Sequence, residues 1–469
     1  MAQALEARGC VVRVARSAGA DALPATMDWL LFFERIAHRT APDAFARNES
    51  APAPGFAGEP DLVVDLAGDA LQGPTPTLRL HFAEGPGEVG LVSALLAGSA
   101  PALAIVLDQA GQEPQTVLDA RLAVERPASF SHALDAAAKR VATLIAQAVA
   151  RLDGGRPDAR PAAHAPALRP LRFAARALAR RILDRITDHV RRDGHWRIAW
   201  RRVEGPGVMD HLSWEGGGWR ALADGGGRYF ADPFLFAHAG RRWLFCEEYP
   251  YATAKGVLSV AAVDADGRPG APSPCLETPT HLSWPQVFAH EGAVYMIPES
   301  AGAGRVELWR ATDFPHRWEL DRVLIENVRA HDPLLHLTGR GAYMLATVDR
   351  DGGSSWDALG LFTAPGLHGP WRAHGRNPVL VDAGVARPAG PFVARPDGLW
   401  RPAQDCRTGY GVGLALCRVT RLDETGYAQE VAAQLGPPPL PGATGVHSLC
   451  RLGDLEMIDV RGARLRVEP

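Results

Sequence analysis

The sequence predicts a multidomain protein, with an α/β domain followed by an all-β five-bladed propeller. Five times in the second half of the chain, two short apolar runs flank a glycine turn. The copies start at Asp232, Trp284, Asp332, Gly390 and His447. Paired strands repeating at roughly fifty residues are typical of propeller blades. Upstream of the repeats, apolar runs of strand length alternate with segments of helical periodicity, which is typical of α/β domains.

Composition narrows the class of protein. The chain has 469 residues, 46% of them hydrophobic and 22% charged, which is typical of a folded protein with more than one domain. A net charge of −3 argues against a nucleic-acid partner. The six cysteines lack metal-binding spacing. No signal-peptide pattern or membrane-spanning apolar run is present, so we expect a cytoplasmic protein without a transmembrane segment.

Residues 1–152 form the predicted α/β domain. Helical patterns cover residues 2–7, 29–37 and 131–152, and strand patterns cover residues 10–15, 61–66, 78–82 and 104–107. This alternation predicts a parallel sheet. A helix precedes the first strand, whereas doubly wound domains begin with a strand. We therefore expect a truncated domain that lacks its first strand.

Residues 78–122 resemble the formyltransferase fold that acts on methionyl-tRNA and nucleotide sugars. That family surrounds its formyl donor with Asn, His and Asp side chains. Residues 81–88 offer His81, Glu84 and Glu88 but no Asn. The resemblance therefore implies a formyltransferase-like domain without the chemistry, used for docking or dimerisation. A formyltransferase acting on an amino sugar stays open as an alternative.

Residues 153–194 form a predicted linker. Its first part is rich in Pro, Gly and Ala, and residues 171–190 form a basic amphipathic helix. Leu171, Leu178 and Ile182 lie on its apolar side, with arginines on the other. We favour a connector packed across the propeller. Peripheral contact with an anionic membrane is the alternative.

Residues 195–469 form the predicted propeller, and its recurring polar positions indicate a site. The first recurring position is the residue at which each copy starts. The second lies fifteen residues later in the first four copies and holds Glu247, Glu299, Thr347 and Asp405. Equivalent residues of successive blades point toward one central channel. Carboxyl groups that converge there, one protonated and one ionised, are what glycosidic chemistry requires. An X-Asp-Pro turn that merely opens a strand is the plainer interpretation.

Three short motifs carry a resemblance to known propellers: Ala-Asp-Pro at 231–233, Pro-Glu-Ser at 298–300 and His-Asp-Pro at 331–333. They resemble the five-bladed arabinanase, xylosidase and invertase clan of glycosidases. Residues 231–405 are more similar to the N-terminal propeller of plant glucosamine inositolphosphorylceramide transferases. In those proteins the sugar transfer is attributed to a separate C-terminal domain, so the resemblance does not imply transferase activity here.

The clan resemblance implies three catalytic residues. Asp232 matches the general base, Asp332 the carboxylate that orients and sets pKa values, and Glu299 the general acid. The clan takes its acid from a blade after the orienting Asp, whereas Glu299 precedes Asp332. Glu248 and Asp405 are therefore alternative acids.

The remaining candidate residues would bind substrate. Trp284 is predicted to stack on a sugar, and polar side chains are predicted to contact its hydroxyl or phosphate groups: Glu248, Gln286, His331, Arg401, Gln404, Asp405 and His447. We expect a carbohydrate or glycolipid ligand, no cofactor and no metal. The function predicted first is glycosyl hydrolysis or transfer. The alternative is a non-catalytic glycan-binding module in a surface-polysaccharide pathway.

Overall fold

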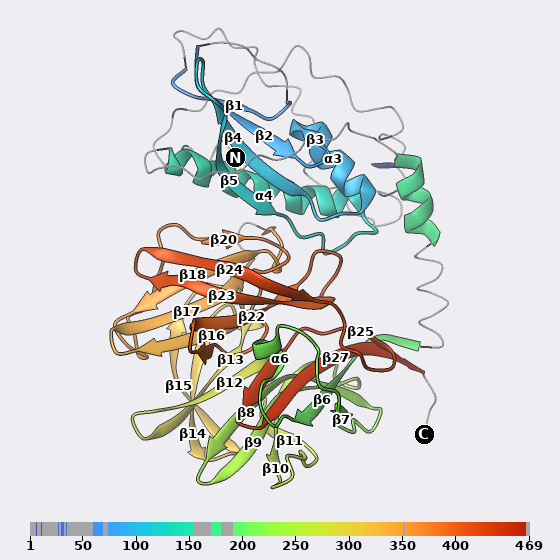
Figure 1. The fold of residues 1–469 in the computed structure, drawn as a ribbon, viewed down its shortest axis with the longest axis vertical. Coiled ribbons are helices and arrows are strands. Elements are labelled where there is room, and N and C mark those ends of the chain that lie inside the picture. The colour runs from blue at the N-terminus through green and yellow to red at the C-terminus, as the bar shows by residue number, and fades with distance from the viewer. Residues whose placement is uncertain are drawn as a thin grey trace. The chain divides into compact units, whose positions relative to one another are not determined.

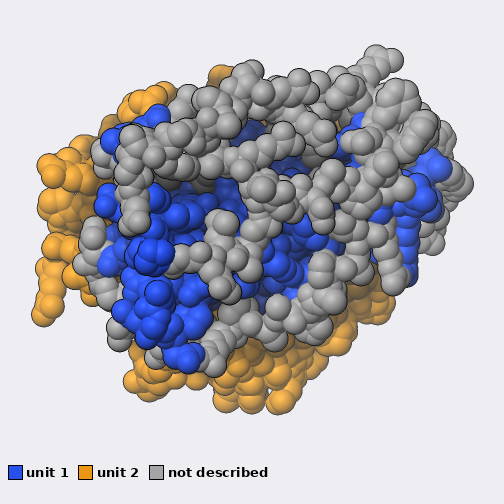
Figure 2. Space-filling model, turned by 90° about the horizontal axis from the view of Figure 1, so that it is seen from above, with its two compact units in different colours: residues 1–185, 351–354 blue, residues 186–350, 355–469 orange. Residues whose placement is uncertain are grey.

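The computed structural model describes residues 60–68, 74–152, 170–179, 191–349 and 352–465, together with residues 6, 11, 27, 30, 31 and 34. The chain divides into two compact units, coloured in Figure 2. Unit 1 contains residues 1–185 and 351–354, and unit 2 contains residues 186–350 and 355–469. The main division falls within the predicted linker. Most elements predicted before residue 60 lie outside the described residues.

Unit 1 contains a mixed five-stranded sheet in the order β1-β2-β4-β5, with β3 paired to β2. Among the described strands of this unit, β1 and β2 run parallel and the other pairs are antiparallel. The predicted parallel sheet is therefore wrong. The sequence analysis missed β5, which returns directly from β4 and needs no crossover helix. The described elements are β1 (Val63–Asp65), β2 (Thr77–Phe82), β3 (Gly85–Pro86), α3 (Gly87–Ala97), β4 (Ala102–Asp108), β5 (Gln115–Arg121) and α4 (Phe130–Arg151).

Two helices of unit 1 bear on the predictions. The start of α4 is capped by Glu34, whose carboxylate accepts hydrogen bonds from the backbone N–H of Phe130 at 2.6 Å and Ser131 at 2.7 Å. A helix over 170–179 buries Phe173 edge-on against Phe130. Leu171 and Leu178, which are predicted on its apolar side, are 66% and 60% exposed, so these two side chains are not buried in this structure. No described helix is long and apolar enough to cross a membrane.

Unit 2 is a propeller-like arrangement of five antiparallel sheets, as the repeat predicted (Figure 1). We number them in the order of the repeats. Sheet 1 contains β8 (Arg228–His238), β9 (Arg241–Pro250), β10 (Val257–Val263) and β11 (Ser273–Leu276). Sheet 2 contains β12 (Ser283–His290), β13 (Ala293–Glu299), β14 (Val306–Asp313) and β15 (Arg317–Ile325). Sheet 3 contains β16 (Ala330–Thr338), β17 (Gly341–Val348), β18 (Ala358–Ala364), β19 (Arg372–Ala373) and β20 (Leu380–Val381).

The last two sheets complete the unit. Sheet 4 contains β21 (Val393–Arg395), β22 (Gly398–Asp405), β23 (Gly413–Asp423) and β24 (Gly426–Leu435). Sheet 5 contains β25 (Ala443–Gly445), β26 (Leu449–Leu452), β27 (Leu455–Leu465), β6 (Arg191–Arg202) and β7 (Arg220–Ala221). Because β6 pairs with β27, strands from both ends of the unit share one sheet, and neither strand is left as an open edge. Short helical turns, α6 (Val208–His211) and η2 (Ala301–Ala303), lie between strands.

The first recurring position has a positive φ in four sheets, and the same left-handed conformation in three of them. Asp232, Trp284 and Asp332 have φ of 49°, 52° and 50°, and Gly390 has φ of 147°. In sheets 1 to 3 the pairing register shifts at this point, which marks a bulge. A left-handed conformation costs a non-glycine residue about 1–2 kcal/mol. Its recurrence therefore indicates a constraint that the rest of the fold maintains.

Candidate functional site

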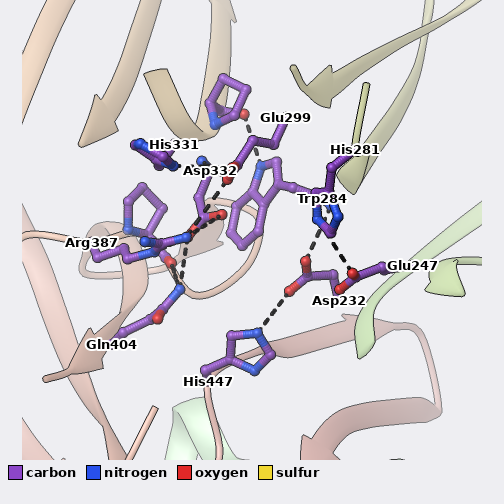
Figure 3. A network of polar contacts seen from close by, with 12 residues as sticks. Asp232, Glu247, His281, Trp284, Glu299, His331, Asp332, Arg387, Gln404 and His447 are labelled. Carbon is purple, nitrogen blue, oxygen red and sulfur yellow. Dashed lines mark hydrogen bonds and ion pairs between the residues drawn. The ribbon is translucent and has the colours of Figure 1, made fainter. Parts of the chain in front are cut away.

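Asp232 lies at the bulge of β8 and is buried (Figure 3). Its Oδ2 accepts a hydrogen bond from the backbone N–H of Trp284 at 3.1 Å, and its Oδ1 accepts one from Ser448 Oγ at 2.9 Å. His447 Nε2 lies 3.3 Å from Oδ1. The Asp232 carboxylate therefore joins sheet 1 to sheets 2 and 5.

A second buried carboxylate, Asp459 of β27, completes this side of the network. It accepts hydrogen bonds from the backbone N–H groups of Asp232, His447 and Ser448 at 2.9 to 3.1 Å. His447 Nδ1 lies 2.7 Å from its Oδ2. Burial lowers the pKa of His447, but Asp459 and Asp232 outweigh it and leave the pKa raised. The protonated form of His447 is therefore favoured by the two carboxyl groups on either side of it.

Glu299, at the end of β13, binds sheet 3. Its Oε1 lies 3.0 Å from His331 Nδ1, and its Oε2 accepts a hydrogen bond from the backbone N–H of Asp332 at 3.0 Å. Burial alone would raise the pKa of Glu299, but His331 and Arg387 hold it well below its usual value. Burial also opposes charge on His331, yet Glu299 raises the His331 pKa to about 9. The two side chains form a charged pair at neutral pH.

Asp332 receives side chains from the segment that leads into sheet 4 and from β22. Arg387 Nε and Gln404 Nε2 donate to its Oδ2 at 2.6 and 2.7 Å. Gln404 also donates to the carbonyl oxygen of Pro388 at 2.9 Å. Burial raises the pKa of Asp332 and Arg387 opposes that shift, so ionisation of this carboxyl depends on the guanidinium.

Glu247 of β9 differs from the other carboxyl groups of the network. It is 5% exposed, and its Oε1 accepts no hydrogen bond. The nearest titratable partner is His281, whose Nε2 lies 3.4 Å from Oε1 and whose pKa is lowered by burial. Burial, followed by the charges of Asp232 and Glu299, raises the pKa of Glu247 well above its usual value. In Figure 3 it lies beside Asp232 and His281.

The network brings together seven of the predicted site residues: Asp232, Trp284, Glu299, His331, Asp332, Gln404 and His447. Trp284 contacts the network through its backbone N–H, which donates to Asp232. Its ring is fully buried against Phe234, and its Nε1 donates to the carbonyl oxygen of Pro333 at 2.8 Å. A stacking platform needs an exposed ring face, and this ring has none. Its predicted sugar contact is therefore not available in this structure.

Four other predicted residues have partners elsewhere in unit 2. Glu248 lies on the opposite face of β9 from Glu247, bound to Arg228 and to Ser259 Oγ at 2.6 Å. Gln286 pairs with the backbone of Leu335 through both amide atoms. Arg401 is fully buried against Tyr427 and Gln429, and Asp405 is bound by Arg407. Their binding roles stay predictions.

The sequence analysis did not select Glu247, His281, Arg387 or Asp459 as site residues. A signal for two of them exists, because His281 and Arg387 both lie three residues before the first recurring position. Tyr229 occupies the same place in sheet 1. Glu247 occupies the second recurring position, although Glu248 was preferred. Asp459 lies twelve residues after His447, with no motif to mark it.

Among the described residues, one group has the spacing of a metal site. Asp232, His447 and Asp459 each offer a ligand atom, and these atoms lie within 4.8 Å of one another. Both carboxylates already accept backbone or hydroxyl hydrogen bonds, and the imidazole lies between them. An ion pair cluster accounts for this arrangement, and the expectation of no metal stays a prediction.

Comparison with known proteins connects this network to one family of sequences. Residues 222–438 match the family model described as Glucosamine inositolphosphorylceramide transferase 1, N-terminal. A protein of that name from Oryza sativa subsp. japonica is 31% identical over 211 residues, which are 44% of this chain and 28% of that protein. The protein of that name from Arabidopsis thaliana is 29% identical over 206 residues, which are 43% and 27% of the two chains.

The matched stretch contains sheets 1 to 4, and with them Asp232, Glu247, Glu299 and Asp332. The predicted resemblance to the N-terminal region of these transferases is confirmed over this stretch. The chain spans less than a third of the length of the curated relatives it matches. The formyltransferase resemblance of unit 1 stays a prediction.

Solved structures of glycosidases also align with the chain. A family 117 glycoside hydrolase from Zobellia galactanivorans aligns with a TM-score of 0.35 and 13% identity, over 57% of this chain and 90% of that chain. The catalytic domain of a Coprinopsis cinerea GH62 α-L-arabinofuranosidase aligns with a TM-score of 0.36 and 12% identity, over 57% and 97% of the chains. At such low values these likenesses say nothing about activity.

Proposed function

We propose that the propeller-like unit recognises the sugar portion of a glycolipid or glycan and does not itself break a glycosidic bond. The observation that carries this proposal is the occupation of the three predicted catalytic carboxylates by donors of the chain itself. Asp232 and Glu299 each accept the backbone N–H at the bulge of the next sheet, and Asp332 accepts Arg387 and Gln404. These carboxylates hold sheets together.

The ligand class follows from the relatives. They are called glucosamine inositolphosphorylceramide transferases, a name that pairs an amino sugar with an inositol-containing sphingolipid. The matched stretch is the N-terminal part of those proteins, and the network lies largely within it. A glycolipid or glycan that contains an amino sugar or an inositol is therefore the ligand we propose for this chain.

The test measures turnover and binding in parallel on the full chain. Turnover is followed by product release from a panel of aryl glycosides and nucleotide sugars, and binding by calorimetry with the intact glycosides. We expect binding without product. Wild-type turnover that Asp232→Asn lowers by orders of magnitude, while Glu307→Gln does not, would contradict the proposal. Glu307 is a matched control because it is also buried and bound, by Arg305 and Trp309, in sheet 2.

Glycosyl hydrolysis or transfer is the second candidate function, and one observation favours it. The pKa of Glu247 is raised and that of Glu299 is lowered within one network, which is how enzymes separate a general acid from a base. If this chain is an enzyme, Glu247→Gln removes the proton donor and abolishes turnover of natural glycosides. Activated aryl glycosides with good leaving groups would be affected much less.

A further inference from the structure

A group of three tyrosines lies where β8 begins and β9 ends. Tyr229 and Tyr249 face one another across the two strands, with ring centroids 4.8 Å apart and nearly parallel planes. Tyr251 meets both rings at a steep angle, with centroids 6.2 and 6.4 Å away. Its hydroxyl lies 2.5 Å from His195 Nδ1, which fixes its position. All three side chains are partly exposed, so the tyrosine group offers ring surface to a ligand.

The strand register connects this tyrosine group to Glu247. Tyr249 and Glu247 are two residues apart on β9, so their side chains share one face of sheet 1. Tyr229 pairs with Tyr249, and Ala231, a small residue, pairs with Glu247. His281 closes the arrangement, because its ring lies 6.1 Å from that of Tyr249 and its Nε2 lies 3.4 Å from Glu247 Oε1. His281 itself is 42% exposed at its side chain.

Glu247 Oε1 is a buried acceptor that receives no hydrogen bond, and the nearest donor, His281 Nε2, lies 3.4 Å away. Such a group is costly to bury, and a ligand that supplies a donor relieves the cost. The charges of Asp232 and Glu299 make the surroundings of Glu247 negative. After burial, they are the largest contributions to its raised pKa. A cationic donor is therefore favoured over a neutral one, since it forms a charge-assisted hydrogen bond.

We propose that the tyrosine group, His281 and Glu247 form a subsite for a sugar ring that carries a protonated amine. The ammonium donates to Glu247 Oε1, and the ring lies against the exposed tyrosine surface, where the positive charge is also attracted to the aromatic faces. This inference rests on the proposed function and names its ligand more closely. It places recognition on sheet 1 rather than on the carboxylates that join the sheets.

The experiment compares two ligands that differ only in the amine, methyl β-glucosaminide and methyl β-glucoside, by calorimetry on the full chain. A charge-assisted hydrogen bond predicts that the glucosaminide binds roughly ten- to a hundredfold more tightly. Glu247→Gln should reduce this ratio to near one while the glucoside still binds. Tyr249→Ala should weaken both ligands several-fold, and His281→Ala, at a half-exposed position, provides a second variant should Tyr249→Ala fail to fold.

Glu307→Gln should leave the ratio unchanged. A ratio that survives Glu247→Gln, or is lost in Glu248→Gln instead, overturns the subsite and leaves the proposed function standing. If neither Tyr249→Ala nor His281→Ala changes the binding of the two sugars, the subsite is also overturned, and the proposed function still stands. If wild-type chain binds neither sugar, the proposed function fails together with the subsite.

Discussion

The ion pair between His331 and Glu299 should make the propeller-like unit less stable at alkaline pH. The His331 pKa of about 9 lies above the usual value of 6.5, because Glu299 outweighs burial. Folding therefore favours the imidazolium, and its stabilisation is present in full below about pH 6.5 and is lost as the pH rises through about 9. The difference of about 2.5 units corresponds to about 3 kcal/mol.

The assay is urea unfolding of the full chain, followed by tryptophan fluorescence at pH 6, 7.5 and 9.5. Trp29 is the one tryptophan that precedes unit 2, so the signal reports almost entirely on the propeller-like unit. Through His331, wild type should lose roughly 2–3 kcal/mol between pH 6 and 9.5. His331→Gln should be less stable at pH 6 and should lose about that much less over the same range, because the raised pKa values of Asp332 and His447 still contribute. Equal pH dependence in the two proteins would refute the assignment of a charged His331–Glu299 pair.

Two further predictions concern stability. Arg387→Met leaves Asp332 buried with Gln404 as its remaining donor, so it should destabilise the unit by about 3–5 kcal/mol in urea unfolding. Combining it with Asp332→Asn should recover part of this loss, and strictly additive effects would show that the two residues are not coupled. Gly390→Ala would place a Cβ 2.0 Å from the carbonyl oxygen of Leu449, and φ at this position is 147°. It should therefore lower the urea concentration at the midpoint of unfolding. Gly436→Ala, where the Cβ meets no atom, is its control, and equal midpoints for the two variants would contradict this account.

The arrangement of unit 2 could be predicted because each repeat consists of short sequence patterns that are local in the chain. Each copy contains two apolar runs and a glycine, and these specify paired strands without knowledge of distant contacts. The first recurring position was also identified correctly as equivalent between sheets. In four of the five sheets its residue has a positive φ, and Asp and Gly are among the few residues that tolerate it. Trp284 shows that the fold can impose this backbone on a residue that does not favour it.

The choice between Glu247 and Glu248 could not be made from the sequence. Neighbouring residues of a strand point to opposite faces, so the choice depends on strand register. A bulge between Ala231 and Phe234 shifts that register, and a bulge depends on contacts with other sheets. The hydrogen-bond partners of the network carboxylates could not be predicted either, because they also depend on contacts between sheets. Asp459 and Asp232 are 227 residues apart in the sequence, and their hydrogen bond exists only when the five sheets close.

Unit 1 was predicted less well, for a local reason. Residues 115–121 mix polar and apolar side chains, and we did not identify them as the strand β5. Without β5, the alternation of strands and helices indicated parallel crossovers. The observed β4–β5 hairpin is antiparallel, and a short turn suffices to connect it.

We expect unit 2 to bind an amino-sugar glycoside through Glu247 and to leave it intact. One nuclear magnetic resonance sample of the full chain with excess methyl β-glucosaminide tests both parts. Saturation transfer from the protein to the ring protons reports binding, and the anomeric signal reports cleavage over a day. We expect saturation transfer that Glu247→Gln reduces to the level seen with methyl β-glucoside, with an unchanged anomeric signal. Release of free glucosamine by wild type, or saturation transfer of equal strength in Glu247→Gln, would contradict it.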